Sequence, residues 1–204
     1  QKTAYEIPKR DWSSDVCSSD LQGLVLPGDT ELMGQPTDFL GVNMYSRAVG
    51  QDAPGEGFLH ARQIRPEGSA YTGFDWEVAP DSLTDLLVRL QQDYAPDAIY
   101  ITENGSTYPD VADEDGNVND LERTQYLTEH LAATQEALAR GAKVAGYFAW
   151  SLMDNFEWAE GYDKRFGIVH VNFDTQVRTP KLSGRTYRDF LARSEEHTSE
   201  LQSR

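Results

Sequence analysis

Three short apolar runs stand out along the chain and predict buried β-strands. They are Phe39–Tyr45 (FLGVNMY), Ala98–Thr102 (AIYIT) and Val144–Trp150 (VAGYFAW). None of them alternates cleanly between apolar and polar residues, which is typical of parallel strands that are covered on both faces. We therefore expect these runs to form a buried parallel sheet.

Helix-type patterns alternate with the strand-like runs. Asp81–Tyr94 predicts a helix that begins at Pro80 and Asp81, and its leucines recur at helical spacing: Leu83, Leu86, Leu87 and Leu90. Asn119–Arg140 predicts a longer helix that Gly141 ends. Its apolar residues are expected on one side: Leu121, Tyr126, Leu127, Leu131 and Leu138. A last helix is expected over about Ser183–Ala192, after Pro180. This alternation predicts βα units and an α/β fold.

Two segments are expected to be long loops, namely Gly50–Glu77 and Trp150–Lys181. Each begins just beyond the C-terminal end of a predicted strand, and long loops often carry function. In a (β/α)₈ barrel this edge of the sheet is the catalytic face. Three βα units cannot close a barrel, so the sheet is either open or part of a larger one.

The composition narrows the possible partners. The 204 residues suffice for one ordinary domain, with 39% apolar and 25% charged residues. The net charge of −16 argues against a nucleic acid or an anionic membrane as partner, because both bind basic surfaces. No apolar run reaches the length of roughly 18–20 residues that a membrane-spanning helix needs.

Two terminal segments look foreign to the rest of the chain. Asp11–Leu21 (DWSSDVCSSDL) and Arg193–Ser203 (RSEEHTSELQS) lack helical and strand periodicity. Both can be back-translated so that the two nucleotide sequences are reverse complements of each other, and they resemble a sequencing adapter. Two natural polar tails are the alternative interpretation. We interpret residues 1–21 as a non-native leader, 193–204 as a non-native tail, and 22–192 as the native portion.

The only cysteine, Cys17, lies in the leader, so the native portion has no disulfide framework. That is typical of an intracellular protein, and we expect a cytoplasmic location.

The first chemical signal is Ile101-Thr102-Glu103-Asn104-Gly105, where a carboxylate follows an apolar strand and Asn-Gly turns the chain. A lone glutamate in a loop is usually just solvated. A glutamate at the end of a rigid strand, however, is held still in the way that a nucleophile attacking a sugar carbon must be.

The second signal is Trp150-Ser-Leu-Met-Asp-Asn-Phe-Glu-Trp158, which leaves an apolar strand and mixes aromatic rings with acids. Aromatic residues after a strand often only cover the core. Sugar binding needs this mixture, because aromatic faces pack on a pyranose and a carboxylate such as Glu157 accepts hydrogen bonds from neighbouring hydroxyls.

Together these segments resemble glycoside hydrolase family 1. The similar segments are Thr37–Tyr45, Tyr100–Gly105 and Gly146–Trp158, with Trp76–Val78, Asp163–Asn172 and Arg178–Lys181 between and after them. The resemblance extends over nearly all of residues 22–192, in the order and spacing of the family. It implies that the three strands are strands 6–8 of a (β/α)₈ TIM barrel, which the chain contains incompletely.

The resemblance implies roles for individual residues. Glu103 corresponds to the nucleophile, and Tyr45 to the tyrosine whose hydroxyl hydrogen-bonds that carboxylate. The residues expected to bind the sugar are Asn43, Trp150, Glu157, Trp158 and Phe166. Met44 replaces a commonly aromatic residue. The Glu157-Trp158 pair favours an unphosphorylated glycoside, so the expected activity is a retaining β-glucosidase, with no metal and no cofactor.

The second catalytic carboxylate of the family is missing. A retaining glycosidase needs an acid/base as well as a nucleophile. The family carries it in an Asn-Glu-Pro motif, which does not occur in this sequence. We therefore expect the chain alone to be inactive, while the parent protein acts on a small β-glucoside or an oligosaccharide.

Three alternatives stay open. The first is that the parent protein is a non-catalytic, carbohydrate-binding barrel, and the second is that it is a transglycosylase. The third is that the chain is a small independent α/β binding domain. Glu103 together with Tyr45 speaks against the first, because binding alone needs neither residue. Aglycone-side residues would separate the second from a hydrolase, and the third would leave too many strand edges unpaired. The preferred sugar and the oligomeric state are not fixed by the sequence.

Overall fold

A computed structural model describes residues 25–56 and 60–202 of the chain. The predicted leader, residues 1–21, lies outside the described residues. The chain divides into two units, of which the larger spans residues 38–49 and 65–204. This larger unit contains the predicted sheet and all the predicted helices.

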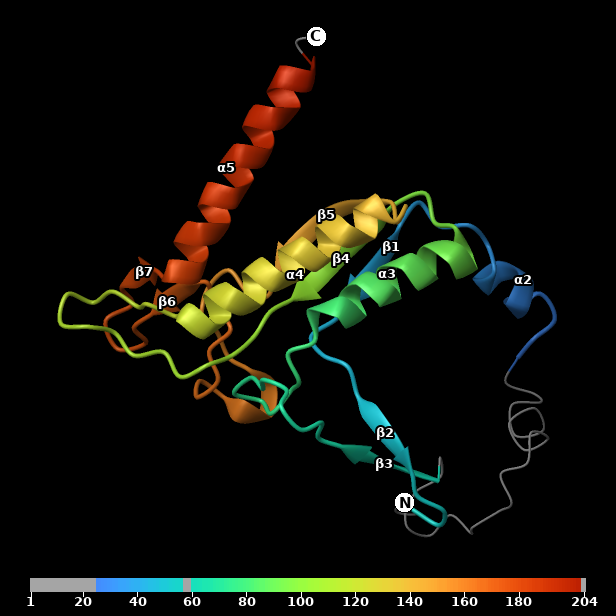
Figure 1. The fold of residues 1–204 in the computed structure, drawn as a ribbon, viewed down its shortest axis with the longest axis horizontal. Coiled ribbons are helices and arrows are strands. Elements are labelled where there is room, and N and C mark those ends of the chain that lie inside the picture. Colours follow the sequence, from blue (N-terminus) through green and yellow to red (C-terminus); the bar gives the residue numbers. More distant parts are fainter. Residues whose placement is uncertain (1–24, 57–59, 203–204) are drawn as a thin grey trace. The chain divides into compact units, whose positions relative to one another are not determined.

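Three parallel strands form the sheet of the larger unit (Figure 1). They are β1 (Leu40–Asn43), β4 (Ile99–Asn104) and β5 (Val144–Ala149), in the order β1-β4-β5. The register pairs Leu40 with Ile99 and Asn43 with Glu103 along β1 and β4. Because all three strands run in the same direction, their carboxyl ends meet at one edge of the sheet.

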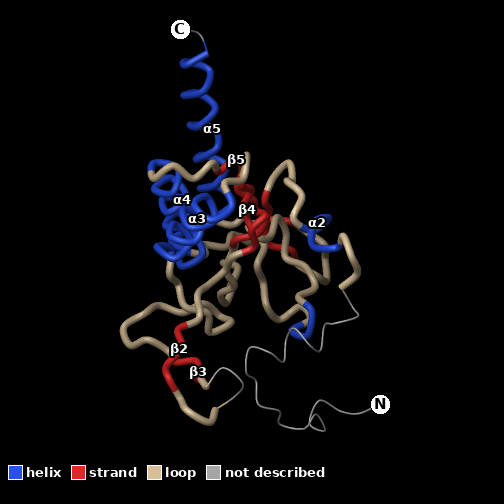
Figure 2. The backbone as a smooth tube through the Cα atoms, turned by 90° about the vertical axis from the view of Figure 1, so that its right-hand side faces the viewer, coloured by secondary structure: helices blue, strands red, loops and turns tan. Residues whose placement is uncertain are grey.

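Two helices cover one face of this sheet (Figure 2). Helix α3 (Pro80–Tyr94) starts with a proline in its first turn, and α4 (Leu121–Ala139) ends before Gly141, whose φ is 95°. Leu83 and Leu87 of α3 are fully buried and pack with Ile99 and Ile101 of β4. The three predicted strands and both predicted helices are therefore confirmed, with bounds that differ by a few residues.

The expectation that the strands are covered on both faces is not met within the described residues. On the face opposite α3 and α4, Gly41 and Thr102 are exposed, and Phe148 is 56% exposed. The described residues supply helices for one face only. The apolar runs gave no sign of this, because a strand buried on one face by helices and bordered by aromatic residues on the other also reads as continuously apolar.

The predicted apolar side of α4 was also partly wrong. Leu121 and Leu138 are 66% and 46% exposed, whereas Arg123 and His130 are buried. The buried side of α4 includes alanines, which allow close packing, and polar residues that are hydrogen-bonded inside the protein. Hydrophobic spacing alone cannot identify such a side, because Arg123 is paired with Asp110 of a distant loop and His130 with a main-chain carbonyl of the same helix.

The two segments expected to be loops contain short strands. In the smaller unit, helix α2 (Asp29–Met33) precedes a two-stranded sheet of β2 (Val49–Asp52) and β3 (Ala61–Ile64). Only Val49, the first residue of β2, is assigned to the larger unit. In the larger unit, the 3₁₀ turn η2 (Trp158–Glu160) precedes the antiparallel pair β6 (Val169–Val171) and β7 (Arg178–Pro180). These strands are too short to show a period of two in the sequence.

The last helix, α5 (Leu182–Gln202), runs ten residues past the predicted end at Ala192. Its second half has no glycine or proline to end it, so the backbone continues the helix without an apolar side. The lack of periodicity in residues 193–202 therefore did not exclude helix.

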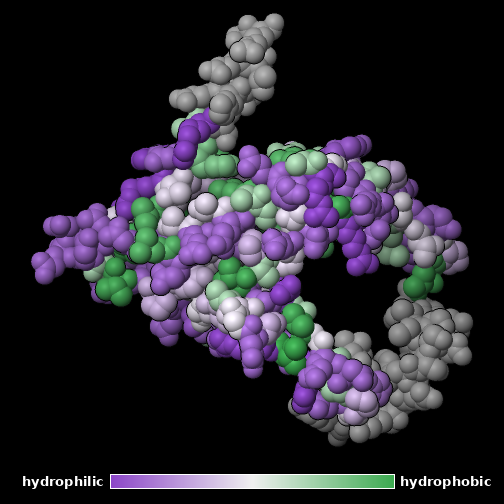
Figure 3. Space-filling model, viewed as in Figure 1, coloured by the Kyte–Doolittle hydropathy of each residue, from purple (hydrophilic) through white to green (hydrophobic). Residues whose placement is uncertain are grey.

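The face drawn in Figure 3 shows scattered apolar residues among polar ones over α3 and α4. Among residues 25–56 and 60–202, no helix has the length and apolar character needed to cross a membrane.

His130 makes the stability of the larger unit depend on pH. The side chain is 1% exposed, and burial lowers its pKa to about 4, although its hydrogen bond with the Tyr126 carbonyl acts in the opposite direction. In the unfolded chain, histidine binds a proton at a pH of about 6.5. Between these two pKa values the unfolded state holds more protons, so this stability is complete above about pH 6.5 and is lost as the pH falls toward about 4.

Between about pH 7 and about pH 5, protonation of His130 in the unfolded chain should lower the unfolding free energy by about 2 kcal/mol. In His130→Gln we expect this part of the decrease to be absent. Urea titrations of the purified chain at a series of pH values measure this slope. The matched control is His60→Gln, which replaces an exposed histidine and should keep the wild-type slope. An unchanged slope in His130→Gln would contradict the assignment.

Candidate active site

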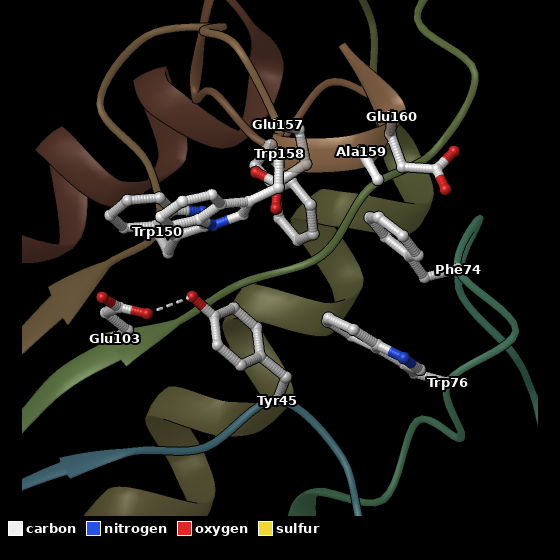
Figure 4. Close-up of a pocket in the computed structure, with 10 residues that line it drawn as sticks. Tyr45, Phe74, Trp76, Glu103, Trp150, Glu157, Trp158, Ala159 and Glu160 are labelled. Carbon is white, nitrogen blue, oxygen red and sulfur yellow. Dashed lines mark hydrogen bonds between the residues drawn. The ribbon is translucent and has the colours of Figure 1, made fainter. Parts of the chain in front are cut away.

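A cavity of about 430 Å³ lies at the carboxyl edge of the sheet in the larger unit (Figure 4). Aromatic rings and carboxylates line it. The lining residues are Tyr45, Phe74, Trp76, Glu103, Trp150, Glu157, Trp158, Ala159, Glu160 and Phe166. Six of the seven residues predicted from the sequence are therefore brought together around one cavity.

The Tyr45 hydroxyl donates a hydrogen bond of 2.5 Å to Oε2 of Glu103 (Figure 4). Burial raises the pKa of Tyr45 well above its ordinary value, and the adjoining Glu103 carboxylate raises it further. Tyr45 is thus held as a protonated donor, and the Glu103 carboxylate is fixed in one orientation. The two residues are 58 positions apart and meet because β1 and β4 are neighbours in the sheet.

Gly105 lets the chain turn immediately after Glu103. A Cβ atom at this position would lie 1.9 Å from the main-chain oxygen of Trp150. The main chain of Trp150 approaches so closely because its N–H donates to the Asn104 carbonyl at 2.8 Å. The glycine of the Glu-Asn-Gly sequence is therefore required by close packing of two strand ends.

Glu157 and two tryptophans form one wall of the cavity. Burial raises the pKa of Glu157, a hydrogen bond from Trp150 acts in the opposite direction, and the nearby Glu103 carboxylate raises it again. Trp158 is 83% exposed and has a φ of 42°, in the left-handed region that bulky residues rarely adopt. A strained, exposed tryptophan beside a carboxylate is a feature of binding sites.

A second aromatic wall was only partly anticipated from the sequence. Phe74 stacks on Trp76 with ring centroids 4.8 Å apart and an interplanar angle of 14°, and both contact the ring of Phe166. Trp76 was noted only as part of a motif, and Phe74 was missed altogether. Their position in the long segment after β1 was the available signal, because that segment begins at the carboxyl edge of the sheet.

Asn43 does not line the cavity. Its side chain is exposed, and its Oδ1 accepts a hydrogen bond of 2.6 Å from the Thr102 hydroxyl on β4. The predicted role of Asn43 in sugar binding stays a prediction.

A buried ionic cluster fixes the loops that carry the cavity. The Lys181 ammonium is fully buried and contacts Asp110 at 2.5 Å and Asp154 at 2.7 Å. Burial lowers the pKa of Lys181, the charge of Arg123 lowers it further, and the two aspartates oppose this. Arg123 of α4 contacts Asp110 as well, at 2.8 Å. The segments after β4 and after β5 are thereby joined to α4.

Asp154 holds the two ends of the segment that contains Glu157 and Trp158. Its carboxylate accepts hydrogen bonds from the main-chain N–H groups of Gly167 and Val171, at 3.0 and 3.2 Å. It also contacts Arg165 at 2.8 Å. Because every oxygen of this buried carboxylate is paired, the segment has a defined shape.

No cluster of three or more His, Cys, Asp or Glu side chains in the described parts of the chain has an arrangement that could hold a metal ion. The cavity offers carboxylates, a phenol and aromatic faces. These groups can bind a polyhydroxylated ring and supply a carboxylate nucleophile.

Fold and site together define an α/β protein with an acidic, aromatic cavity at the carboxyl edge of a parallel sheet. The sequence profile of glycosyl hydrolase family 1 matches residues 19–196. The chain belongs to this family.

Individual relatives agree with this assignment. The chain is 41% identical to β-glucosidase A of Thermotoga maritima over 162 residues, which are 78% of this chain and 35% of the relative. It is 40% identical over 185 residues to a bifunctional β-D-glucosidase/β-D-fucosidase of Bifidobacterium breve, covering 83% of this chain and 40% of the relative. The chain thus spans less than half the length of these relatives.

A solved structure shows the same fold. The family 1 β-glucosidase of Thermotoga maritima in complex with isofagomine lactam superposes with a TM-score of 0.76 at 38% identity. The superposition covers 80% of this chain and 36% of that protein.

The close approach at Gly105 gives a direct test. We expect Gly105→Ala to lower the free energy of unfolding by about 3 kcal/mol, because the added methyl group overlaps the Trp150 carbonyl and the two strand ends must separate. Urea unfolding followed by tryptophan fluorescence measures the change. Gly50→Ala is the matched control, since nothing lies within 4 Å of its added Cβ, and it should change stability by about 0.5 kcal/mol or less. Equal stabilities of the two variants would contradict the close approach.

Proposed function

We propose that the whole protein is a retaining β-glycosidase of the β-glucosidase type, which removes terminal β-D-glycosyl residues through a covalent intermediate on Glu103. The observation that carries this proposal is the hydrogen bond from Tyr45 to Glu103 inside an aromatic cavity. A binding protein needs no fixed carboxylate beneath the ring it holds, whereas a nucleophile must be oriented before it attacks.

The reaction follows from this arrangement. A carboxylate oxygen of Glu103 attacks the anomeric carbon, and the bond to the aglycone oxygen breaks as that oxygen receives a proton from a second carboxylic acid. A water molecule then attacks the same carbon from the face that the aglycone left. Its proton passes to the second carboxylate, Glu103 leaves, and the sugar keeps its original configuration.

The sugar itself is held by the wall of Trp150, Glu157 and Trp158. The indole faces pack on the C–H faces of the ring, and Glu157 accepts hydrogen bonds from hydroxyl groups. The relatives include a β-glucosidase and a bifunctional β-D-glucosidase/β-D-fucosidase. We therefore assign an unphosphorylated β-glucoside or a short oligosaccharide as substrate, without choosing between closely related sugars.

We further propose that β1, β4 and β5 are the sixth, seventh and eighth strands of a (β/α)₈ barrel. Within the described residues, β1 and β5 each pair with β4 alone, so each has a free edge. The face opposite the helices is exposed at Gly41 and Thr102. Free edges on both sides and one uncovered face are the features that closing a barrel would remove.

The nucleophile can be tested in the whole protein, with the sequence upstream of residue 22 restored. We expect Glu103→Ala to lower kcat for an aryl β-glucoside by about 1,000-fold or more, because the variant cannot form the covalent intermediate. Added azide should restore turnover and give an α-glucosyl azide, since azide attacks from the position of the lost carboxylate.

The control for this experiment is Glu136→Ala, which removes an exposed acid of α4 and should keep full activity. Full activity of Glu103→Ala would eliminate the proposal.

The isolated chain gives a second test. We expect the purified 204-residue chain to release no measurable nitrophenol from an aryl β-glucoside, because the sequence contains no Asn-Glu-Pro motif to supply the proton donor. The whole protein, assayed in parallel, is the positive control. If the isolated chain did turn over the glucoside, and Glu103→Ala abolished that activity, the expectation would be wrong. Another carboxylate of this chain would then serve as the acid.

A further inference from the structure

Asn104 follows Glu103 directly and points away from the cavity. The strand is irregular here, because its register with β5 shifts between Ile101 and Asn104. Glu103 therefore lines the cavity, while Asn104 is fully buried on the helix side. Its Nδ2 donates to the Met44 carbonyl at 2.7 Å and to the Tyr126 hydroxyl at 3.2 Å. Its Oδ1 accepts from the Tyr147 hydroxyl at 2.5 Å. The Met44 carbonyl can only accept, which fixes the orientation of the amide.

Tyr126 of α4 connects this amide to Tyr45. Its hydroxyl accepts from Asn104 and donates to the main-chain carbonyl of Tyr45 at 2.8 Å. Tyr45 is thereby held at both ends, since its own hydroxyl donates to Glu103. The contacts close a ring that runs from Glu103 to the Tyr45 hydroxyl, from the Tyr45 carbonyl to Tyr126, and through Asn104 back to Glu103.

The Tyr126 ring has little freedom to move. It is 1% exposed and stacks on the His130 ring at 3.8 Å with an interplanar angle of 20°. His130 also bonds the Tyr126 carbonyl at 2.8 Å. The hydroxyl of Tyr126 is therefore a fixed point on α4 to which the main chain of Tyr45 is hydrogen-bonded.

We propose that Asn104 and Tyr126 are positioning residues for the nucleophile, because together they set where the Tyr45 hydroxyl meets the Glu103 carboxylate. The catalytic role of Asn104 and Tyr126 rests on the proposed function of Glu103. Their effect on the position of the Tyr45 hydroxyl is independent of that function. Helix α4 contributes no residue to the lining of the cavity, yet through Tyr126 it fixes the position of Tyr45, whose hydroxyl donates to Glu103.

Small displacements matter in such an arrangement. A reacting group has to be held within about 0.5 Å of its productive position by residues that are themselves locked in place. Without the Tyr126 hydroxyl, the Tyr45 carbonyl loses the donor from α4, and the Asn104 amide keeps only the Met44 carbonyl as acceptor. Tyr45 can then shift relative to β4.

The test is Tyr126→Phe, which keeps the ring and its stacking on His130 and removes only the hydroxyl. Proton NMR of the purified chain reads the Tyr45 hydroxyl, whose short hydrogen bond to a carboxylate places its resonance far downfield. The Tyr45→Phe variant assigns this signal. We expect Tyr126→Phe to move the signal upfield or to lose it through faster exchange with water.

The matched control is Tyr187→Phe, which removes another tyrosine hydroxyl that donates to a main-chain carbonyl, that of Tyr147, at 3.0 Å. This contact lies outside the ring, so the Tyr45 signal should stay unchanged. An unchanged signal in Tyr126→Phe as well would overturn the proposal. If Tyr126→Phe does not fold, Tyr147→Phe decides, since it removes only the donor to Oδ1 of Asn104 and should shift the signal in the same direction by less.

The whole protein separates this proposal from the assignment of the nucleophile. We expect Tyr126→Phe to lower kcat by about 10- to 100-fold with little change in KM, as for a misplaced reacting group. If Glu103→Ala kept full activity, the proposed function would fail, but the NMR experiment would still decide whether Tyr126 sets the contact of Tyr45 with Glu103.

Discussion

The Lys181 ammonium lies fully buried between the carboxylates of Asp110 and Asp154, and the cavity loops depend on this contact. A buried charge is tolerated only when it is paired, so the segments that supply the two aspartates must close around the lysine. One of those segments follows β4 and the other follows β5. Their closure places Trp150, Glu157 and Phe166 on the same side of the sheet edge. The walls of the cavity are thus set by charged residues that do not line it.

The parallel direction of β1, β4 and β5 is the second constraint. It brings the residues at three strand ends to one edge, where Tyr45 can reach Glu103 across 58 positions of sequence. The fully buried Asn104 amide connects the same three strand ends beneath the cavity. Sheet, buried amide and helix α4 together hold the contact between Tyr45 and Glu103, as our proposal that Glu103 is a nucleophile requires.

The elements that the sequence predicted well are those with strong local signals. Helix α3 begins at Pro80 and packs Leu83 and Leu87 in the core, as the leucine spacing indicates. Predictions failed where the decisive partner is distant. Leu121 and Leu138 of α4 are exposed while Arg123 is buried. This arginine is buried because Asp110 from the segment after β4 pairs with it, together with Asp120 at the start of the helix. Phe74 was missed for a similar reason, since it joins the cavity by packing on Trp76 and on the distant Phe166.

The sequence by itself determined the three parallel strands, helices α3 and α4, and six residues that share the cavity. The strands and helices rest on local chemistry, because apolar runs and helix start signals act within a few residues. The cavity residues followed from the resemblance to the family, with the Glu-Asn-Gly turn as the local signal for Glu103. The tertiary structure alone decided the bond between Tyr45 and Glu103, the contact that demands Gly105, and the ring through Asn104 and Tyr126. Each of these joins segments far apart in the chain, and such contacts exist only once strands and helices have packed.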